Sequence, residues 1–138
     1  MVEVFLDTSY AVALSVANDQ YHGKAMEIRD WLKTESARIV TTRAILVEIG
    51  NFMAKVRYRD AAVALLDVLE KDSSVEIVPL SESLYERAFR LYRERSDKEW
   101  SLTDCISFVV MEDRNLTGAL TTDEDFEQAG FRALLREV

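Results

Sequence analysis

Short apolar stretches alternate along the chain with longer segments in which apolar residues recur at helical spacing. The short stretches are rich in Val, Ile, Leu and Phe and are too short for ordinary helices, so they predict strands. They are Val2–Leu6, Arg38–Val40, Val75–Val78, Leu116–Leu120 and Phe131–Leu135. The clearest segments with helical spacing are His22–Thr34, Arg43–Arg57, Asp60–Lys71, Ser83–Arg95 and Thr103–Arg114. This alternation predicts an α/β fold with a mainly parallel sheet covered by helices on both faces.

Helix starts and chain breaks refine this picture. Ser83 with Glu86 and Ser101 with Asp104 have the spacing of capping boxes, which mark the first turn of a helix. Four glycines and one proline in 138 residues, with no repeat, favour a compact unit with short connections. We therefore expect one domain that covers residues 1–138.

Composition excludes several classes of protein. A single cysteine, Cys105, rules out an internal disulfide, and a single histidine, His22, rules out a zinc site of ordinary His/Cys spacing. The first residues lack the basic leader of a secretory signal, and no apolar run approaches the roughly 20 residues needed to span a membrane. These features favour a cytoplasmic protein.

The net charge of −8 opposes binding of polyanions, unless a bound cation reverses the local sign. Basic residues nevertheless form two clusters in the sequence. For the first cluster, contact with phosphates and simple solvation both remain open, whereas the second is expected to form intrahelical ion pairs on a solvated face. The first comprises Arg43, Lys55, Arg57 and Arg59, and the second Arg87, Arg90, Arg93 and Arg95.

Two predicted strands are followed directly by acids. Asp7 follows the first strand and Asp123 the fourth, and functional groups of parallel sheets gather beyond the carboxyl ends of the strands. Asp7 is equally explained as the cap of the next helix, and Asp123 as part of a surface turn. The pattern does not choose between Asp123 and Asp125 as the functional acid.

Glu48 lies at the margin of an apolar helix stripe. At 100° per residue, this stripe comprises Ile45, Ile49, Phe52 and Val56. A carboxylate at such a margin is partly desolvated and needs a partner, which is either a functional ligand or a base such as Lys55.

Asp104 opens a helix whose first two turns are apolar on nearly all sides, so that the helix should be buried. The alternative is a first-turn acid that only stabilises the helix dipole. If Asp104 converges with Asp7, Glu48 and Asp123, mutual repulsion in a partly desolvated site favours a divalent cation. Oxygen ligands favour Mg²⁺ or Mn²⁺.

At these residues the sequence resembles the PIN-domain family, in particular the VapC-type toxins of toxin–antitoxin pairs. The matching pieces are Phe5-Leu6-Asp7-Thr8-Ser9, Thr41-Thr42 with Val47-Glu48-Ile49 and Asn51, Ser101-Leu102-Thr103-Asp104-Cys105, and Leu120-Thr121-Thr122-Asp123 followed by Phe126. The resemblance implies a three-layer α/β/α sandwich around a five-stranded sheet. It also implies a metal-binding catalytic set of Asp7, Glu48, Asp104 and Asp123, supported by Thr8 and Thr122. Asp125 stands where many relatives have histidine.

The resemblance implies a ribonuclease that cleaves RNA with metal-activated water. In such an enzyme, Arg43, Lys55 or Arg57 of the first basic cluster would guide the RNA. The resemblance also implies a homodimer held inactive by a small antitoxin protein. Trp100 either stacks on a base or packs in the core, and apolar residues around Phe89 face either a partner or the core. The alternatives are a degenerate PIN-like binding module and a PIN nuclease of RNA processing. A haloacid-dehalogenase phosphatase is disfavoured because Ser9 replaces its second aspartate.

Overall fold

The computed structural model describes all 138 residues and contains one sheet of five parallel strands. The strand order is β3-β2-β1-β4-β5, with every neighbouring pair parallel. Each predicted strand is present, although the last two are shorter than expected. The strands are β1 (Glu3–Leu6), β2 (Arg38–Thr42), β3 (Val75–Val78), β4 (Gly118–Leu120) and β5 (Arg132–Ala133).

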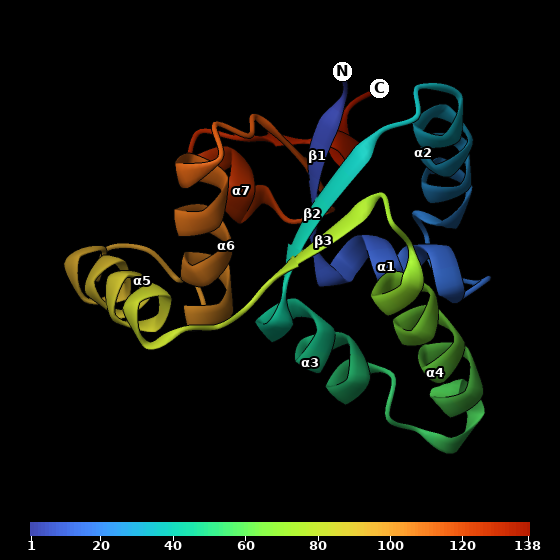
Figure 1. Ribbon diagram of the computed structural model, residues 1–138, viewed down its shortest axis with the longest axis horizontal. Helices are drawn as coiled ribbons and strands as arrows, with labels where there is room; N and C mark the ends of the chain where they lie inside the picture. The colour runs from blue at the N-terminus through green and yellow to red at the C-terminus, as the bar shows by residue number, and fades with distance from the viewer.

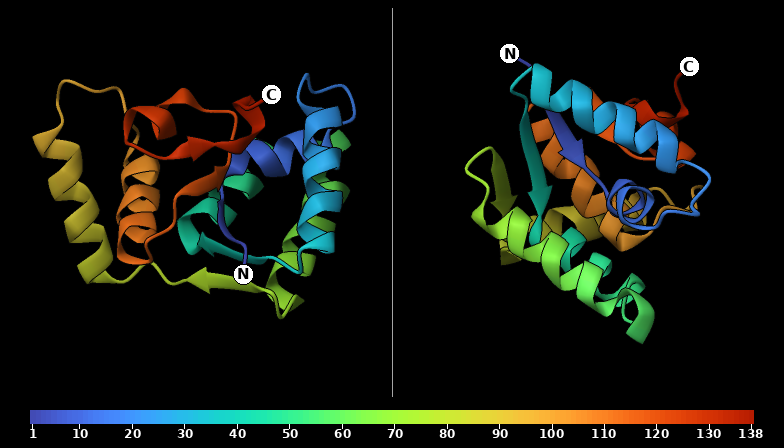
Figure 2. Two further views of the ribbon diagram at one scale, coloured as in Figure 1. Left: turned by 90° about the horizontal axis from the view of Figure 1, so that it is seen from above. Right: turned by 90° about the vertical axis from the view of Figure 1, so that its right-hand side faces the viewer.

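Helices cover both faces of the sheet, which confirms the predicted three-layer sandwich (Figure 1). The layer formed by α1, α2 and α4 lies on one face, and the layer formed by α5, α6 and α7 lies on the other (Figure 2). The helices are α1 (Thr8–Ser15), α2 (His22–Thr34), α3 (Arg43–Phe52), α4 (Val56–Lys71), α5 (Glu82–Glu94), α6 (Leu102–Asp113) and α7 (Glu124–Gln128), followed by a 3₁₀ turn at Leu134–Arg136.

The core is organised around strand β1 and helix α6. Both faces of β1 are covered, and α6 is buried along most of its length, as its apolar sequence predicts. Phe108 of α6 contacts Phe126 of α7 edge-on, with ring centroids 4.9 Å apart. Trp100 packs against Phe108 in the same manner at 5.0 Å and is only 6% exposed, so its role is core packing. This packing fixes α6, and with it the position of Asp104, against the sheet.

The predicted helix Arg43–Arg57 is wrong beyond Phe52. Helix α3 ends at Phe52, and a new helix begins at Val56. The buried face of α3 continues from Ile49 to Met53, which is 1% exposed, whereas Phe52 and Val56 are 67% and 93% exposed. The apolar stripe therefore follows i, i+4 spacing through Met53, and the chain turns once that residue is buried. The start of α4 also corrects the prediction of a helix beginning at Asp60.

One predicted cap is confirmed and the other is wrong. Ser101 and Asp104 form a reciprocal capping box at the start of α6. Ser83 does not cap a helix, because α5 begins at Glu82 and the hydroxyl of Ser81 accepts the backbone N–H of Leu84 at 3.1 Å. The helix starts earlier than predicted.

The arginines of α5 do not form the predicted intrahelical ion pairs. Arg87 instead makes a bidentate pair with Asp113 of α6, with both N–O distances 2.7 Å. The guanidinium of Arg93 lies over the ring of Phe89 at 4.9 Å. Arg87 therefore ties α5 to α6, while Arg93 covers a ring of its own helix. No helix of the structure is long and apolar enough to cross a membrane.

Candidate acidic active site

The candidate site lies where the direction of strand succession reverses in the sheet. From β1 the chain proceeds to β2 on one side, and it later returns to β4 on the other side of β1. At such a switch point the connections leave the sheet in opposite directions and open a crevice beyond the carboxyl ends of the strands. Asp7 follows β1 there, and its backbone N–H donates to the carbonyl of Leu120 at 3.2 Å.

All four predicted acids meet in one cleft at this edge of the sheet, with a volume of about 580 Å³. They come from the ends of β1 and β4, from the middle of α3 and from the first turn of α6. Asp19, in the loop after α1, also lines the cleft, and sequence analysis did not identify it. The lining residues are Asp7, Thr8, Ser9, Val12, Asp19, Glu48, Phe52, Asp104, Thr122 and Asp123.

Asp7 is the most buried of these acids, with 6% of its surface exposed. One carboxylate oxygen, Oδ2, accepts the Thr121 hydroxyl at 2.7 Å and contacts the Ser9 hydroxyl at 3.0 Å. The pKa of Asp7 is raised to about 6, mainly by burial and to a smaller degree by the charge of Glu48, against the lowering effect of the hydrogen bonds from Thr121 and Ser9. Asp7 is therefore held by neutral donors only.

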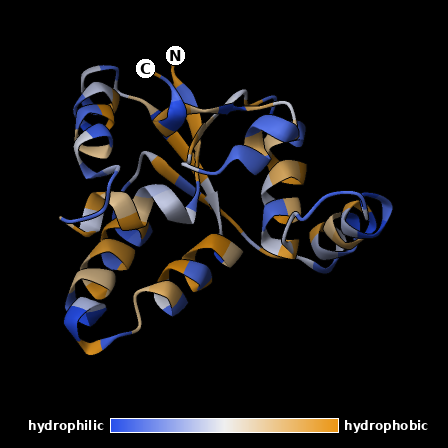
Figure 3. Cartoon of the chain, turned by 180° about the vertical axis from the view of Figure 1, so that it is seen from behind, coloured by the Kyte–Doolittle hydropathy of each residue, from blue (hydrophilic) through white to orange (hydrophobic).

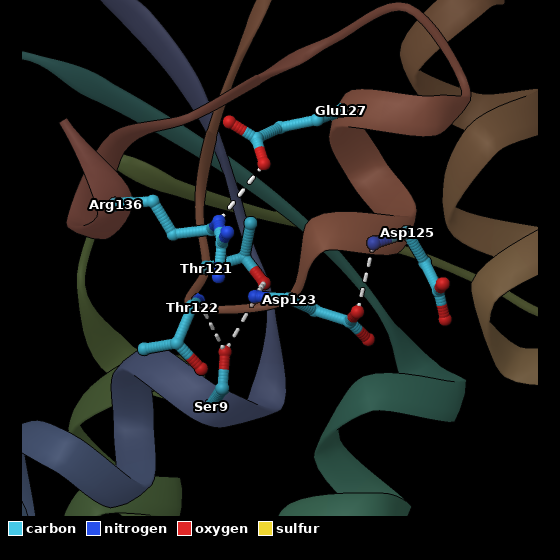
Figure 4. Close-up of polar contacts among 7 residues, drawn as sticks. All are labelled: Ser9, Thr121, Thr122, Asp123, Asp125, Glu127 and Arg136. Carbon is cyan, nitrogen blue, oxygen red and sulfur yellow. Dashed lines mark hydrogen bonds and ion pairs between the residues drawn. The ribbon is translucent and has the colours of Figure 1, made fainter.

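Thr121 is a second polar residue that sequence analysis missed, since the neighbouring Thr122 was expected to support the acids. The fully buried Thr121 hydroxyl contacts Asp7 and also accepts the backbone N–H of Asp123 at 3.0 Å. Thr122 contributes its backbone N–H to the hydroxyl of Ser9 at 3.0 Å, as Figure 4 shows. Adjacent residues of an extended segment point in opposite directions, so only one of the two threonines can face Asp7.

Asp123 and Asp125 lie next to each other and to Asp104. One carboxylate oxygen from each of the three lies within 4.8 Å of the others. Asp123 also caps α7 by accepting the backbone N–H of Asp125 at 2.9 Å (Figure 4). Burial and the charge of Asp123 raise the pKa of Asp125. Asp123 lines the cleft, whereas Asp125 stands beside it.

Asp104 both stabilises the start of α6 and lines the cleft, which are the two roles considered for it from the sequence. As part of the capping box, its Oδ2 accepts the backbone N–H of Ser101 at 3.1 Å. Burial raises its pKa to about 7, and the charges of Asp123, Asp7 and Asp125 add to this effect. The first turn of α6 thus places in the cleft a carboxylate whose charged form is destabilised by burial and by the neighbouring acids.

Glu48 is half-buried on α3 and accepts the hydroxyl of Thr8 at 2.5 Å. The expected alternative, an ion pair with Lys55, is not formed. Thr8 is itself buried, so that this hydrogen bond fixes α3 relative to the start of α1. The bond therefore sets the distance between Glu48 and the neighbouring Asp7.

No basic side chain neutralises the acids of the cleft. The seven ion pairs of the protein all lie elsewhere, and none includes Asp7, Glu48, Asp104 or Asp123. Grouped carboxylates that receive only neutral hydrogen bonds remain uncompensated. An all-oxygen donor set of this kind fits Mg²⁺ or Mn²⁺.

The three residues expected to guide RNA are exposed at α3 and α4. Arg43 forms an ion pair with Glu70, so its charge is partly neutralised. Lys55 is the N-cap residue of α4, and the guanidinium of Arg57 lies 4.8 Å from the centre of the Tyr58 ring. Neither Lys55 nor Arg57 is paired with an acid, so both charges are available to a ligand.

Comparison with known proteins shows the family to which the fold and the acidic cleft belong. The family model described as "PIN domain" matches residues 4–132. The 23S rRNA-specific endonuclease VapC20 of Mycobacterium tuberculosis is 29% identical over 128 residues, which are 93% of this chain and 95% of that protein. The crystal structure of VapC20, described as a Sarcin-Ricin loop cleaving toxin, superposes with a TM-score of 0.83 at 27% identity and covers 94% of this chain and 97% of that one.

Two further structures share the fold at lower identity. VapBC2 from Rickettsia felis has a TM-score of 0.67 at 16% identity and covers 96% of both chains. FitAcB from Neisseria gonorrhoeae has a TM-score of 0.61 at 20% identity and covers 94% of both chains. The chain belongs to the PIN-domain family. Among the members compared, it is homologous to the VapC20 toxin along nearly its whole length.

Proposed function

We propose that this protein is a metal-dependent endoribonuclease and the toxin of a toxin–antitoxin pair. The observation that carries the proposal is the cleft in which Asp7, Glu48, Asp104 and Asp123 meet without a basic partner. The presence of all four acids disfavours a degenerate binding module. The homology to VapC20 favours a toxin over a PIN nuclease of RNA processing.

Each acid has a role that its position supports. Asp7 and Asp104 would be the principal ligands of the cation, because both line the cleft and both have a pKa raised by burial and neighbouring charge. Glu48, fixed by Thr8, orients the attacking water and takes its proton. Asp123 completes the oxygen set from the other side. A divalent cation bound here would supply a lowered pKa for the attacking water and a charge that offsets the one developing on the phosphate.

The substrate proposed for the cleft is RNA, and a ribosomal RNA loop is the leading candidate because VapC20 is described as a 23S rRNA-specific endonuclease and a Sarcin-Ricin loop cleaving toxin. The cleft is open to solvent at the edge of the sheet, as an endonuclease requires. Lys55 and Arg57 lie on the helix that follows α3 and carry unpaired positive charge for the RNA backbone.

The partners proposed are a second copy of the chain and a small antitoxin, as the resemblance to VapC-type toxins implies. Sedimentation of the purified protein tests the dimer. Co-purification with the product of an adjacent reading frame tests the antitoxin. Suppression of RNA cleavage by that product is the expected result.

The function is tested by cleavage of ribosomal RNA with Mg²⁺ or Mn²⁺. Asp7→Asn and Asp104→Asn should each abolish cleavage, because each removes a charged metal ligand at nearly unchanged volume. The matched control is Asp67→Asn, which changes an exposed acid of α4 outside the cleft. Equal cleavage by all four proteins, or none by the wild type with either metal, would contradict the proposal.

A further inference from the structure

Helix α5 carries a ladder of three exposed aromatic rings. Tyr85, Phe89 and Tyr92 follow i, i+4, i+7 spacing and therefore lie on one face of the helix. Each side chain is between 41% and 47% exposed. Successive ring centroids are 6.2 Å and 6.4 Å apart, with interplanar angles of 24° and 29°. The rings therefore present similarly oriented faces along the helix, and neither the core nor the acidic cleft uses them.

Positive charge accompanies this aromatic ladder. The guanidinium of Arg93 lies 4.9 Å from the centre of the Phe89 ring, and Arg93 forms no ion pair. Phe89, Tyr92 and Arg93 also line a cleft of about 540 Å³, which lies in the range of roughly 300–1,000 Å³ typical of ligand sites. Lys98 is a second cation of this cleft, and Glu99 is its single acid.

This aromatic cleft connects to the acidic cleft through the start of α6. Ser101 lines the aromatic cleft, and its backbone N–H donates to Asp104 Oδ2 at 3.1 Å. Asp104 in turn lines the acidic cleft. The two clefts are thus separated by one turn of helix, so a chain that occupies one can reach the other.

The combination of rings and charges favours nucleic acid over a protein surface. Lysine is depleted at the centres of protein interfaces, whereas Lys98 lines this cleft beside Arg93 and the rings of Phe89 and Tyr92. In Figure 3 the ribbon of α5 is mostly blue and white, unlike the orange strands of the sheet. Aromatic faces beside cations bind unpaired bases by stacking, while the cations contact the phosphates.

We propose that the ladder of Tyr85, Phe89 and Tyr92, with Arg93 and Lys98, binds unpaired bases of the RNA whose backbone enters the acidic cleft. The proposal rests on the proposed ribonuclease function and adds where the unpaired part of the substrate binds. Stacking is tolerant of sequence but requires bases that are free of pairing. The ladder therefore selects loops and single strands over duplex RNA.

The test measures binding of two RNA probes to the full-length protein without divalent metal, so that no cleavage occurs. One probe is a hairpin with a purine-rich loop, and the other is a fully paired duplex of equal length. The variant is Phe89→Leu with Tyr92→Leu, which removes two rings but keeps apolar bulk. The matched control is Trp31→Ala, a ring of 42% exposure on α2, across the molecule from α5 (Figure 2).

The double variant should bind the hairpin about tenfold or more weakly, because two stacked bases are lost. It should bind the duplex as the wild type does. The single variant Phe89→Tyr, which keeps a ring at this position, should bind the hairpin as the wild type does. Equal weakening for both probes, or no weakening, would overturn the proposal. So would a variant that changes from dimer to monomer with unchanged hairpin binding, because the ladder would then be a contact between copies.

Cleavage of the hairpin in Mn²⁺ by the wild type is measured alongside. If the wild type binds and cleaves the hairpin while the double variant does so equally well, only the role of the ladder fails. If the wild type neither binds nor cleaves RNA, the proposed function fails with it.

Discussion

The hydroxyl of Thr121 donates a hydrogen bond of 2.7 Å to the carboxylate of Asp7, although 114 residues separate the two in the chain. The same hydroxyl accepts the backbone N–H of Asp123. One buried oxygen therefore joins the acid that follows β1 to the acid that follows β4. The relationship fixes the two carboxylates relative to each other before any cation binds.

Replacement of Thr121 by Val keeps the shape of the side chain and removes its hydrogen bonds to Asp7, to the Asp123 N–H and to the Ser9 hydroxyl. We expect metal affinity or cleavage to fall about 10–100-fold, as is usual when the residues that orient metal ligands are changed. The free energy of unfolding should fall by about 1–3 kcal/mol, because the Asp123 N–H loses its acceptor. Calorimetric titration with Mn²⁺ and urea unfolding measure the two effects.

The control for this variant is Thr122→Val, because the Thr122 hydroxyl makes no hydrogen bond within the protein while its side chain still lines the cleft. It should bind Mn²⁺ like the wild type. If Thr122→Val and Thr121→Val weaken binding equally, the role assigned to Thr121 is wrong.

Neutralising Asp104 should stabilise the metal-free protein. The pKa of Asp104 is about 7, so that as the pH rises through 7 its carboxylate ionises against burial and against the charges of Asp123, Asp7 and Asp125. Asp104→Asn removes this repulsion and keeps an oxygen for the Ser101 cap, so the free energy of unfolding should rise by about 1–3 kcal/mol. Thermal unfolding in chelator should show a higher Tm for the variant.

Saturating Mn²⁺ should reverse this order, because only the wild type gains the full binding energy of the cation. A variant with a lower Tm than the wild type in chelator would show that the Asp104 carboxylate supports the fold and does not strain it.

The stability of the metal-free protein should decrease as the pH rises. The pKa of Asp7 is about 6 and that of Asp104 about 7 in the folded protein, above the ordinary value of 3.8. The folded protein therefore binds these protons more tightly than the unfolded chain does. The resulting stabilisation is complete below the ordinary pKa and is lost as the pH rises through about 6 and 7.

Urea unfolding in chelator at about pH 5 and about pH 7.5 measures this loss, which should be on the order of 1–3 kcal/mol. Mn²⁺ affinity should change in the opposite direction and weaken as the pH falls, because the ligands must lose their protons. Stability that is independent of pH across this range in both the wild type and Asp104→Asn would contradict the pKa assignments.

Lys55 and Arg57 should contribute to RNA affinity through phosphates. Their joint replacement by Ala should weaken binding to all RNA sequences and reduce the slope of log K against log salt by about 1.4, or roughly 0.7 per phosphate contact. Lys71→Ala is the control, because Lys71 is exposed at the far end of the same helix, about 21 Å from Arg57. A salt slope that is equal in wild type and double variant would exclude these contacts.

The fold was predictable from local sequence to a considerable extent. The Val-, Ile- and Phe-rich stretches and the buried helix that carries Asp104 determine strands and helices through short-range preference and burial. The predictions of the fold that failed concern the residues at which helices begin and end. The end of α3 was misplaced because Phe52 and Met53 are both apolar, and only packing decides which of them the core accepts.

The sequence by itself determined that acids follow two strands, that Glu48 borders a buried stripe and that Asp104 opens a buried helix. Only the tertiary structure decided that these acids share one cleft without a basic side chain paired to them, and that Thr121 rather than Thr122 holds Asp7. The aromatic face of α5 was likewise read as either core or partner surface until burial resolved it. The physical reason is that side-chain spacing is a local property, whereas convergence, desolvation and charge compensation depend on residues distant in the chain.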